Sequence, residues 1–290
     1  MARKKVLTKI AAIQMASGPQ VEANLMAAVA LIKEAADRGA QMAVLPENFV
    51  LMPMQESENI DIAEVYNNGH IQSFIGDCAR ENSIWIVAGS IPLKTNTEGK
   101  VTSTSLLFNS EGEIVARYNK MHLFDVTFGD DAIGNDTRDI SIKKGKADTY
   151  HESAIFSAGS EVVVVDTPFG KVGMSICYDL RFPNLFREMV NKGAEIILIP
   201  SAFTAATGKV HWEPLLRARA IENQCYVIAA AQGGYHVNGR ETWGHTMVID
   251  YWGQTHGVLE KGSGSIMIDI DLDAQAVTRK NFPVLEHRKL

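Results

Sequence analysis

Short apolar runs alternate with amphipathic stretches along the chain. Residues 7–15 and 42–45 are apolar runs, and residues 21–38 between them carry apolar side chains at helical spacing and end before Gly39. A short apolar run favours a buried strand, whereas a period of three to four residues favours a helix. The start of the chain therefore predicts a strand-helix-strand unit.

The same alternation continues to the C-terminal part of the chain. It predicts a helix over residues 71–81, strands over 84–88, 103–109, 114–118, 162–166 and 171–176, a helix over 183–192, a strand over 196–199, a helix over 209–223, and strands around Val227, Val248 and Ile268. Turn residues at 110–112 and 167–170 predict two hairpins. Hairpin strands pair antiparallel and helix-linked strands pair parallel, so the sheets must be mixed. The pattern fits a sandwich of two sheets with helices outside.

One cysteine follows a predicted strand directly. Cys177 lies in the sequence Val-Gly-Met-Ser-Ile-Cys-Tyr-Asp-Leu-Arg-Phe-Pro, residues 172–183. A strand that ends in a tight turn before a helix holds a thiol at the sheet edge, where helix N-terminal amides favour a thiolate. A buried structural cysteine is the ordinary alternative. The motif alone leaves both readings open.

Two other motifs supply the partners that a cysteine hydrolase needs. The strand at 42–45 ends at Pro46 and presents Glu47, and the strand at 114–118 leads into Lys120. Considered singly, each is more ordinary as a surface carboxylate or a solvated lysine. Together they place a base, a cation and a thiol after three strands, which favours nucleophilic catalysis.

With these motifs the chain resembles the nitrilase, or carbon-nitrogen hydrolase, superfamily, which has a Glu-Lys-Cys triad in this chain order. Glu47, Lys120 and Cys177 match the triad, and the similarity runs from residues 10–15 to 283–288. The resemblance implies one domain over the whole chain, residues 1–290, folded as an α/β four-layer αββα sandwich of two mixed sheets. It also implies hydrolysis of a carbon-nitrogen amide bond. The scattered histidines and the lack of a Cys-x-x-Cys pair argue against a metal, and we expect no cofactor.

The chemistry that these residues permit passes through a thioester. Cys177 would attack the amide carbonyl, activated either by the Lys120 cation or by proton transfer to Glu47. Glu47 would then protonate the leaving amine and activate the hydrolytic water. Lys120 and the backbone N–H of Tyr178 would stabilise the oxyanion.

A fourth catalytic residue and an insertion follow from the comparison with the family pattern. Glu152 resembles the second glutamate that orients the lysine in family members. The stretch over residues 126–149 departs from that pattern, because it is longer and rich in Asp, Lys and Gly. We expect an exposed loop insertion with a solvated charge run. Since it starts and ends beside the catalytic residues, a lid is the second interpretation.

The segment at 201–208 and those that follow it are most similar to the family branch that hydrolyses deaminated glutathione. That resemblance implies release of 2-oxoglutarate and cysteinylglycine. Phe203 and Thr204, with Tyr178, are candidates to line the pocket. Arg181 is a candidate partner for a substrate carboxylate, although a structural salt bridge is at least as plausible an explanation for it.

Polar residues on and near the helix at 209–223 have weaker claims. His211, Arg217 and Arg219 are expected to be structural, and Glu213 is a candidate to join the catalytic network.

Several alternative functions remain open at this point. An omega-amidase acting on 2-oxoglutaramate, or another small aliphatic amidase, would share the triad. A nitrilase proper fits the sequence around Cys177 less well. A non-catalytic scaffold or a redox sensor would have no reason to keep both Glu47 and Lys120. A papain-like pair would need a histidine beside Cys177, and no motif places one of the candidates there, which are His122, His151, His211 and His245.

Composition narrows the class of protein. The 290 residues are 46% hydrophobic and carry a net charge of -6, which suits one large core and argues against a nucleic-acid partner. The basic start at residues 3–5 is too short for a targeting or membrane segment. The remaining cysteines, Cys78 and Cys225, form no disulfide or metal pattern with Cys177, which favours a cytoplasmic protein.

The resemblance also implies a homo-oligomer, a dimer or larger. The contact would use the helix with Arg187 and Met189 and a C-terminal tail that reaches a partner subunit.

Overall fold

The computed structural model describes residues 7–128 and 148–289, whose main strands form two six-stranded sheets. The strands are β1 (Thr8–Gln14), β2 (Met42–Val44), β3 (Trp85–Lys94), β4 (Val101–Phe108), β5 (Ile114–Asn119), β6 (Asp125–Phe128), β7 (Asp148–His151), β8 (Val164–Thr167), β9 (Gly170–Met174), β10 (Ile196–Leu198), β11 (Tyr226–Ala229), β12 (Gly233–Tyr235), β13 (Glu241–Trp243), β14 (Thr246–Ile249), β15 (Thr255–Leu259) and β16 (Gly264–Ile270). The helices are α1 (Val21–Asp37), α2 (Glu58–Asp61), α3 (His70–Asn82), α4 (Pro183–Asn191), α5 (Ala205–Asn223) and α6 (Leu272–Asn281), with 3-10 turns η1 (Glu152–Ala154) and η2 (Cys177–Arg181).

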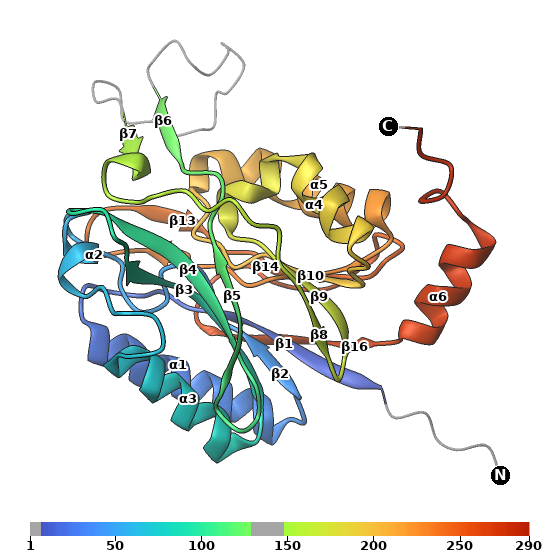
Figure 1. Cartoon of the computed structure of the whole chain (residues 1–290), viewed down its shortest axis with the longest axis horizontal. Helices are drawn as coiled ribbons and strands as arrows, with labels where there is room; N and C mark the ends of the chain where they lie inside the picture. The colour runs from blue at the N-terminus through green and yellow to red at the C-terminus, as the bar shows by residue number, and fades with distance from the viewer. Residues whose placement is uncertain (1–6, 129–147, 290) are drawn as a thin grey trace.

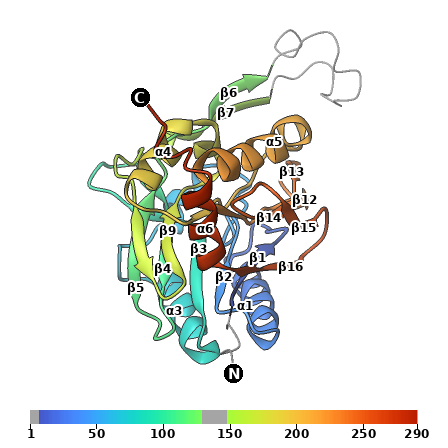
Figure 2. The ribbon, with the colours of Figure 1, turned by 90° about the vertical axis from the view of Figure 1, so that its right-hand side faces the viewer.

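The two sheets face each other between two layers of helices (Figure 1). One sheet has the order β16-β1-β2-β3-β4-β5 and the other β15-β14-β11-β10-β9-β8. Each has three parallel strands at its centre, β1-β2-β3 and β9-β10-β11, flanked by antiparallel strands. Helices α1 and α3 lie outside the first sheet, and α4 and α5 lie outside the second (Figure 2). The predicted four-layer sandwich of mixed sheets is confirmed.

Strand β1 shows why its sequence is apolar without alternation. Ile10 and Ala12 belong to the core between the two sheets, whereas Ala11 and Ile13 belong to the core between the first sheet and its helices. All four side chains are fully buried. A strand that is covered on both faces has no solvent-facing positions, so every residue is apolar.

Two elements extend beyond their predicted bounds. Strand β3 continues past residue 88 to Lys94, because a register shift between Ala88 and Ile91 lets it keep pairing with β4. Helix α5 begins at Ala205 instead of residue 209, and Gly208 lies inside it. A Cβ at Gly208 would lie 2.3 Å from the Cβ of Trp243, so glycine is there for close packing and does not mark the helix start.

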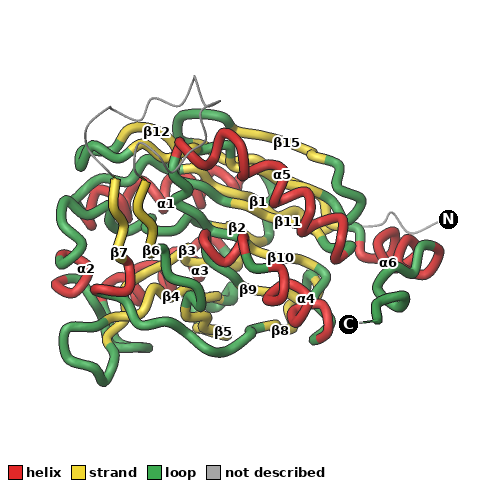
Figure 3. The backbone as a smooth tube through the Cα atoms, turned by 90° about the horizontal axis from the view of Figure 1, so that it is seen from above, coloured by secondary structure: helices red, strands yellow, loops and turns green. Residues whose placement is uncertain are grey.

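The sequence pattern did not predict several short or polar elements. Strands β12 and β13 have three residues each, and β15 and α6 lack a clear periodic spacing of apolar residues. Helix α6 lies at one end of the molecule (Figure 3). Its Gln275 and Arg279 donate to the carbonyl oxygen of Gln224 at 2.8 and 3.0 Å. Polar docking of this kind leaves no hydrophobic periodicity to detect.

The predicted insertion over residues 126–149 is described only at its two ends. Strand β6 pairs antiparallel with β7, from Asp125 opposite His151 to Phe128 opposite Asp148. Residues 129–147 of the predicted loop lie outside the described residues. In the described part of the chain, none of the helices combines the length and apolar character that crossing a bilayer requires.

We expect Gly89→Ala to destabilise the fold near the end of β2. A Cβ at Gly89 would lie 1.8 Å from the backbone oxygen of Pro46, and backbone cannot yield as a flexible side chain does. Overpacking of this kind costs about 1–3 kcal/mol, so the denaturation midpoint should fall. Gly18→Ala is the matched control, because its Cβ would meet no atom within 4 Å. Equal stability of the two variants, measured by chemical denaturation, would contradict this account.

Candidate active site

Cys177 lies at a strained turn between strand β9 and helix α4. Its φ is 45°, in the left-handed region that residues with a Cβ seldom adopt. The backbone N–H of Cys177 donates to the carbonyl oxygen of Pro200 at 2.9 Å. From α5, the guanidinium of Arg219 donates to the carbonyl oxygen of Leu180 at 2.8 Å. These contacts hold the turn, so Arg219 is structural, as the sequence suggests.

Glu47 lies just beyond the end of β2, where the backbone also bends sharply. The following residue, Asn48, has a φ of 56°, and its backbone N–H donates to Ser90 Oγ at 2.9 Å. The Glu47 side chain is 4% exposed. Its Oε2 accepts from the backbone N–H of Ala202 at 2.7 Å, a residue that follows β10. Strand ends of both sheets therefore meet at this carboxylate.

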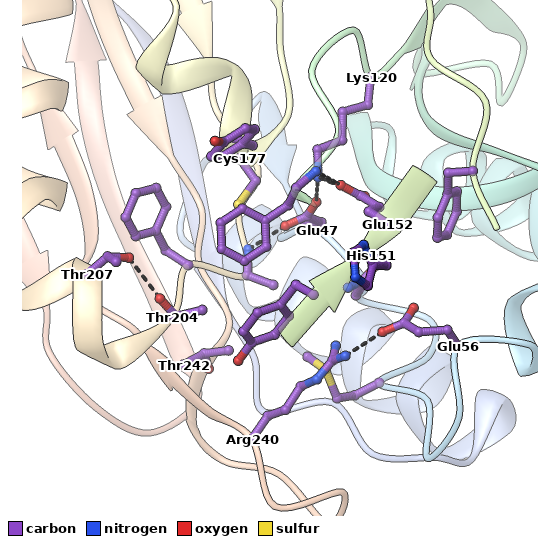
Figure 4. A pocket seen from close by; sticks show the side chains of 18 of the residues that line it. Glu47, Glu56, Lys120, His151, Glu152, Cys177, Thr204, Thr207, Arg240 and Thr242 are labelled. Carbon is purple, nitrogen blue, oxygen red and sulfur yellow. Dashed lines mark hydrogen bonds and ion pairs between the residues drawn. The ribbon is translucent and has the colours of Figure 1, made fainter. Parts of the chain in front are cut away.

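Lys120 connects the two glutamates. Its Nζ donates to Glu47 Oε1 at 2.8 Å and to both carboxylate oxygens of Glu152 at 2.9 Å (Figure 4). Glu152 is fixed in turn, since the backbone N–H of Phe124 donates to its Oε2 at 2.6 Å. The structure thus brings together the four residues that the sequence predicts as catalytic.

The electrostatics of this cluster keep Cys177 protonated. Burial raises the pKa of the Cys177 thiol well above its usual range, the Glu47 carboxylate raises it further, and Lys120 lowers it. Burial alone would lower the pKa of Lys120, but Glu152 and Glu47 together raise that pKa well above normal. The pKa of Glu152 is raised by burial and by Glu47, against the effect of Lys120. One cation beside two carboxylates leaves little positive charge for a thiolate.

A pocket of about 120 Å³ opens in front of these side chains. All four predicted substrate-binding residues line it, namely Tyr178, Arg181, Phe203 and Thr204. The Arg181 guanidinium lies 4.8 Å from the ring centre of Phe203 and 3.1 Å from His211 Nδ1. Burial lowers the pKa of Arg181. Within residues 7–128 and 148–289, this arginine contacts an aromatic ring and an imidazole and forms no structural salt bridge.

Position separates Cys177 from the other two thiols. All three cysteines are free and buried. Burial also raises the pKa of Cys78 to about 11 and that of Cys225 to about 12. Only Cys177 of the three lines the pocket. It therefore differs from Cys78 and Cys225 in its access to a ligand in the pocket, and not in having a lower pKa.

The buried carboxylate of Asp179 was missed by the sequence reasoning. Its Oδ2 accepts from Tyr118 Oη at 2.6 Å and from the Ile176 backbone N–H at 2.9 Å, and its Oδ1 accepts from the His122 backbone N–H at 3.0 Å. It thereby ties the Cys177 turn to the segment that carries Lys120. The only feature of the sequence that could have indicated this role is the position of Asp179, an acidic residue two positions after the cysteine.

The hairpin of β12 and β13 also contributes to the pocket without a sequence signal. Arg240 and Thr242 line it, together with Thr149 and Tyr150 of β7. Arg240 and Thr242 are far from the catalytic motifs in sequence, so no local pattern marks them, whereas Thr149 and Tyr150 come shortly before Glu152.

Glu213 does not join the catalytic network, contrary to expectation. It is exposed on α5 and lies 3.9 Å from Arg217, one helical turn away. Of the candidate histidines, His122 contacts Asp179 and stacks on Phe182. His151 lines the pocket, but the charged groups that act on the Cys177 thiol are Glu47 and Lys120.

The two-sheet sandwich with outer helices presents a buried cysteine beside a Glu-Lys-Glu cluster, an arrangement suited to nucleophilic hydrolysis. The family model for carbon-nitrogen hydrolases matches residues 9–280, so the chain belongs to the carbon-nitrogen hydrolase family.

Known relatives agree with this membership. The chain is 41% identical to a deaminated glutathione amidase of Yersinia enterocolitica, over 97% of this chain and 92% of the relative. It is 35% identical to the human protein of that name, over 98% of this chain and 83% of the relative. The crystal structure of the Caenorhabditis elegans NitFhit protein superposes with a TM-score of 0.85 at 37% identity, covering 98% of this chain and 66% of that one.

The charges around Cys177 predict opposite effects of two isosteric substitutions on its pKa. Glu47→Gln removes a carboxylate that raises the pKa of the thiol, so alkylation of Cys177 at pH 8 should accelerate about tenfold. Lys120→Met removes a cation that lowers the pKa, so alkylation should slow. Peptide mass spectrometry after iodoacetamide pulses measures both rates, with Cys78 and Cys225 as internal controls. Changes of the same sign in both variants would contradict the assignment.

Asp179→Asn should loosen the link between the Cys177 turn and the Lys120 segment. The amide places an NH₂ group against donors that now meet a carboxylate, which costs about 3 kcal/mol of unfolding free energy. Tyr118→Phe removes one hydrogen bond and should cost about 1 kcal/mol. Urea denaturation of both variants measures the difference. A smaller loss for Asp179→Asn than for Tyr118→Phe would refute this role.

Proposed function

We propose that this protein is an amidase that hydrolyses deaminated glutathione into 2-oxoglutarate and cysteinylglycine through a thioester on Cys177. One observation carries the proposal: Glu47, Lys120, Glu152 and Cys177 converge in one pocket. Family membership supports amide hydrolysis, and similarity to the deaminated glutathione amidase of Yersinia enterocolitica supports the substrate.

The first half of the reaction begins with a neutral thiol. Because the pKa of Cys177 is raised, attack is coupled to transfer of the thiol proton to Glu47. The sulfur forms a bond to the amide carbon, and the carbonyl oxygen becomes an oxyanion that Lys120 and the Tyr178 backbone N–H stabilise. Glu47 then gives its proton to the amide nitrogen, the carbon-nitrogen bond breaks, and the amine leaves.

The second half restores the enzyme. Glu47 takes a proton from water, whose oxygen attacks the thioester carbon. The carbon-sulfur bond breaks, the carboxylic acid leaves, and the proton returns to the Cys177 sulfur. The same carboxylate acts as base, acid and base again. The hydrogen bond from the Ala202 N–H to Glu47 Oε2 fixes it in one position for all steps.

Glu152 has a positioning role in this proposal. Both of its carboxylate oxygens accept from Lys120 Nζ at 2.9 Å, so Glu152 holds the ammonium beside Glu47. A fully buried lysine without such partners would lose its charge, because burial disfavours the ammonium. Glu152 therefore keeps Lys120 both charged and oriented.

Arg181 is the proposed partner of the 2-oxo acid carboxylate. It lines the pocket, and its guanidinium lies over the ring of Phe203 and donates to the imidazole of His211. Neither neighbour neutralises its charge, so the surroundings favour an anion there. The pKa of His211 is lowered by burial and by Arg181. An imidazole that stays neutral leaves the charge of Arg181 available to substrate.

An omega-amidase acting on 2-oxoglutaramate is the second candidate. It would use the same four residues and the same contact at Arg181. The names of the relatives favour deaminated glutathione.

We further propose a cytoplasmic homo-oligomer that acts in metabolite repair. The free state of all three cysteines supports a reducing compartment. Trp252, Val277 and Phe282 are 60%, 57% and 52% exposed near the C-terminal end, which supports a contact between subunits there. On helix α4, which the family resemblance implies in such a contact, Arg187 is partly exposed and Met189 is fully buried in its own chain beside Gly173.

Loss of any triad residue should abolish turnover without unfolding the protein. We expect Cys177→Ala, Glu47→Gln and Lys120→Met each to lower kcat by at least about a thousandfold. Release of 2-oxoglutarate measures activity, and circular dichroism checks the fold. Wild-type protein trapped with substrate should show an acyl adduct on Cys177 in mass spectrometry. Full activity in any of the three variants would refute the proposed roles.

Substrate choice is tested by direct competition of two amides. We expect a higher kcat/KM for deaminated glutathione than for 2-oxoglutaramate. Cysteinylglycine release measures the first reaction, and ammonia release measures the second. A strong preference for 2-oxoglutaramate would establish the omega-amidase alternative.

A further inference from the structure

A second arginine lines the pocket, away from Arg181. Arg240 comes from the turn between β12 and β13 and points into the pocket, on the other side of it from Cys177 in Figure 4. Its guanidinium lies 5.4 Å from the ring centre of Tyr150 on β7 and forms an ion pair with Glu56. The proposed chemistry at Cys177 does not use this cation.

The backbone around Arg240 is built to hold it in place. Its N–H donates to Asn238 Oδ1 at 3.0 Å, and its carbonyl oxygen accepts from the His236 backbone N–H at 2.9 Å. Asn238 Nδ2 donates to the carbonyl oxygen of Pro53 at 2.7 Å. The tip of the hairpin is thereby fastened to the segment that carries Glu56.

The ion pair between Arg240 and Glu56 can be broken at a low cost in free energy. The side chains of Arg240 and Glu56 are 33% and 40% exposed, whereas those of the structural pair Arg219 and Glu222 are 6% and 30% exposed. Partly exposed ion pairs are weak because water solvates both charges once they separate. A ligand carboxylate can therefore take the place of Glu56 on Arg240.

The proposed substrate has a carboxylate for each arginine. Deaminated glutathione carries one on the 2-oxo acid end of the acyl half and another on the glycine of the leaving half. An extended dipeptide spans about 7 Å, so the glycine carboxylate lies well away from the carbonyl that Cys177 attacks. Arg181 belongs to the same turn η2 as Cys177 and lines the pocket beside it, whereas Arg240 lies across the pocket from Cys177 (Figure 4).

We propose that Arg240 binds the terminal carboxylate of the leaving cysteinylglycine, and that Glu56 occupies Arg240 until substrate displaces it. This inference rests on the proposed function and deepens it. A guanidinium binds a carboxylate through two parallel hydrogen bonds, which fixes the orientation of the leaving dipeptide. Arg240 then selects a peptide leaving group over ammonia, which offers no carboxylate.

The test compares substrates that differ only at this end. Deaminated glutathione, its C-terminal glycinamide and 2-oxoglutaramate are assayed with wild-type protein, Arg240→Gln and Arg240→Lys. We expect wild-type kcat/KM to favour the free acid over the glycinamide by about 10- to 100-fold, as loss of a charged hydrogen bond implies. Arg240→Gln should bring this ratio close to one, and Arg240→Lys should retain part of it. A ratio within one variant cancels any general loss of folded enzyme.

Two further variants separate binding from a structural role. Arg38→Gln, which removes an exposed arginine directly after α1, should leave the ratio unchanged. Glu56→Gln should leave KM for the free acid unchanged or lower it, because the competing carboxylate is gone. If Glu56→Gln and Arg240→Gln instead impaired all substrates equally, the ion pair would be merely structural and the assignment would be overturned.

Other outcomes are equally decisive. A wild-type enzyme that does not distinguish the acid from the glycinamide overturns the role of Arg240 alone. An Arg240→Gln variant that loses activity on 2-oxoglutaramate as much as on the free acid places Arg240 at the acyl half and also overturns it. A wild-type enzyme that cleaves neither peptide substrate overturns the proposed function, and this role with it.

Discussion

The buried ammonium of Lys120 is the contact on which the site depends. Removing a lysine from water costs several kcal/mol unless partners compensate, and Glu47 and Glu152 do so at 2.8 and 2.9 Å. Each glutamate arrives from a different part of the chain. The need to satisfy one cation therefore draws the end of β2, the end of β5 and the turn η1 to a single point, and Cys177 lies against the result.

Backbone conformation provides the second constraint. Cys177 and Asn48, one on each sheet, both have positive φ values, 45° and 56°. Such conformations cost free energy and persist only where surrounding contacts determine them. Asp179 and Ser90 supply some of those contacts. The reactive side chains are thus held by turns that the packed sheets enforce, and the pocket is preorganised before any substrate arrives.

The outer part of the pocket is built differently from its floor. The floor comes from strand ends of the two central sheets, whereas the wall comes from strand β7, the hairpin β12-β13 and the segment that carries Glu56. Rigid strand ends suit the bond-breaking chemistry, which every amide needs in the same form. Hairpins vary more readily between proteins, so they are the natural place to select among amides.

The sequence by itself determined the sandwich, the mixed sheets and the triad Glu47, Lys120 and Cys177, because apolar runs and three strand-end motifs are local signals. Glu152 followed from the resemblance to the family. Only the tertiary structure decided that Asp179 joins two of those motifs and that Arg240 reaches the same pocket. It also decided that Glu213 stays outside. Those relations connect residues distant in sequence, and a side chain's position depends on how sheets and hairpins pack, which no local pattern of polarity records.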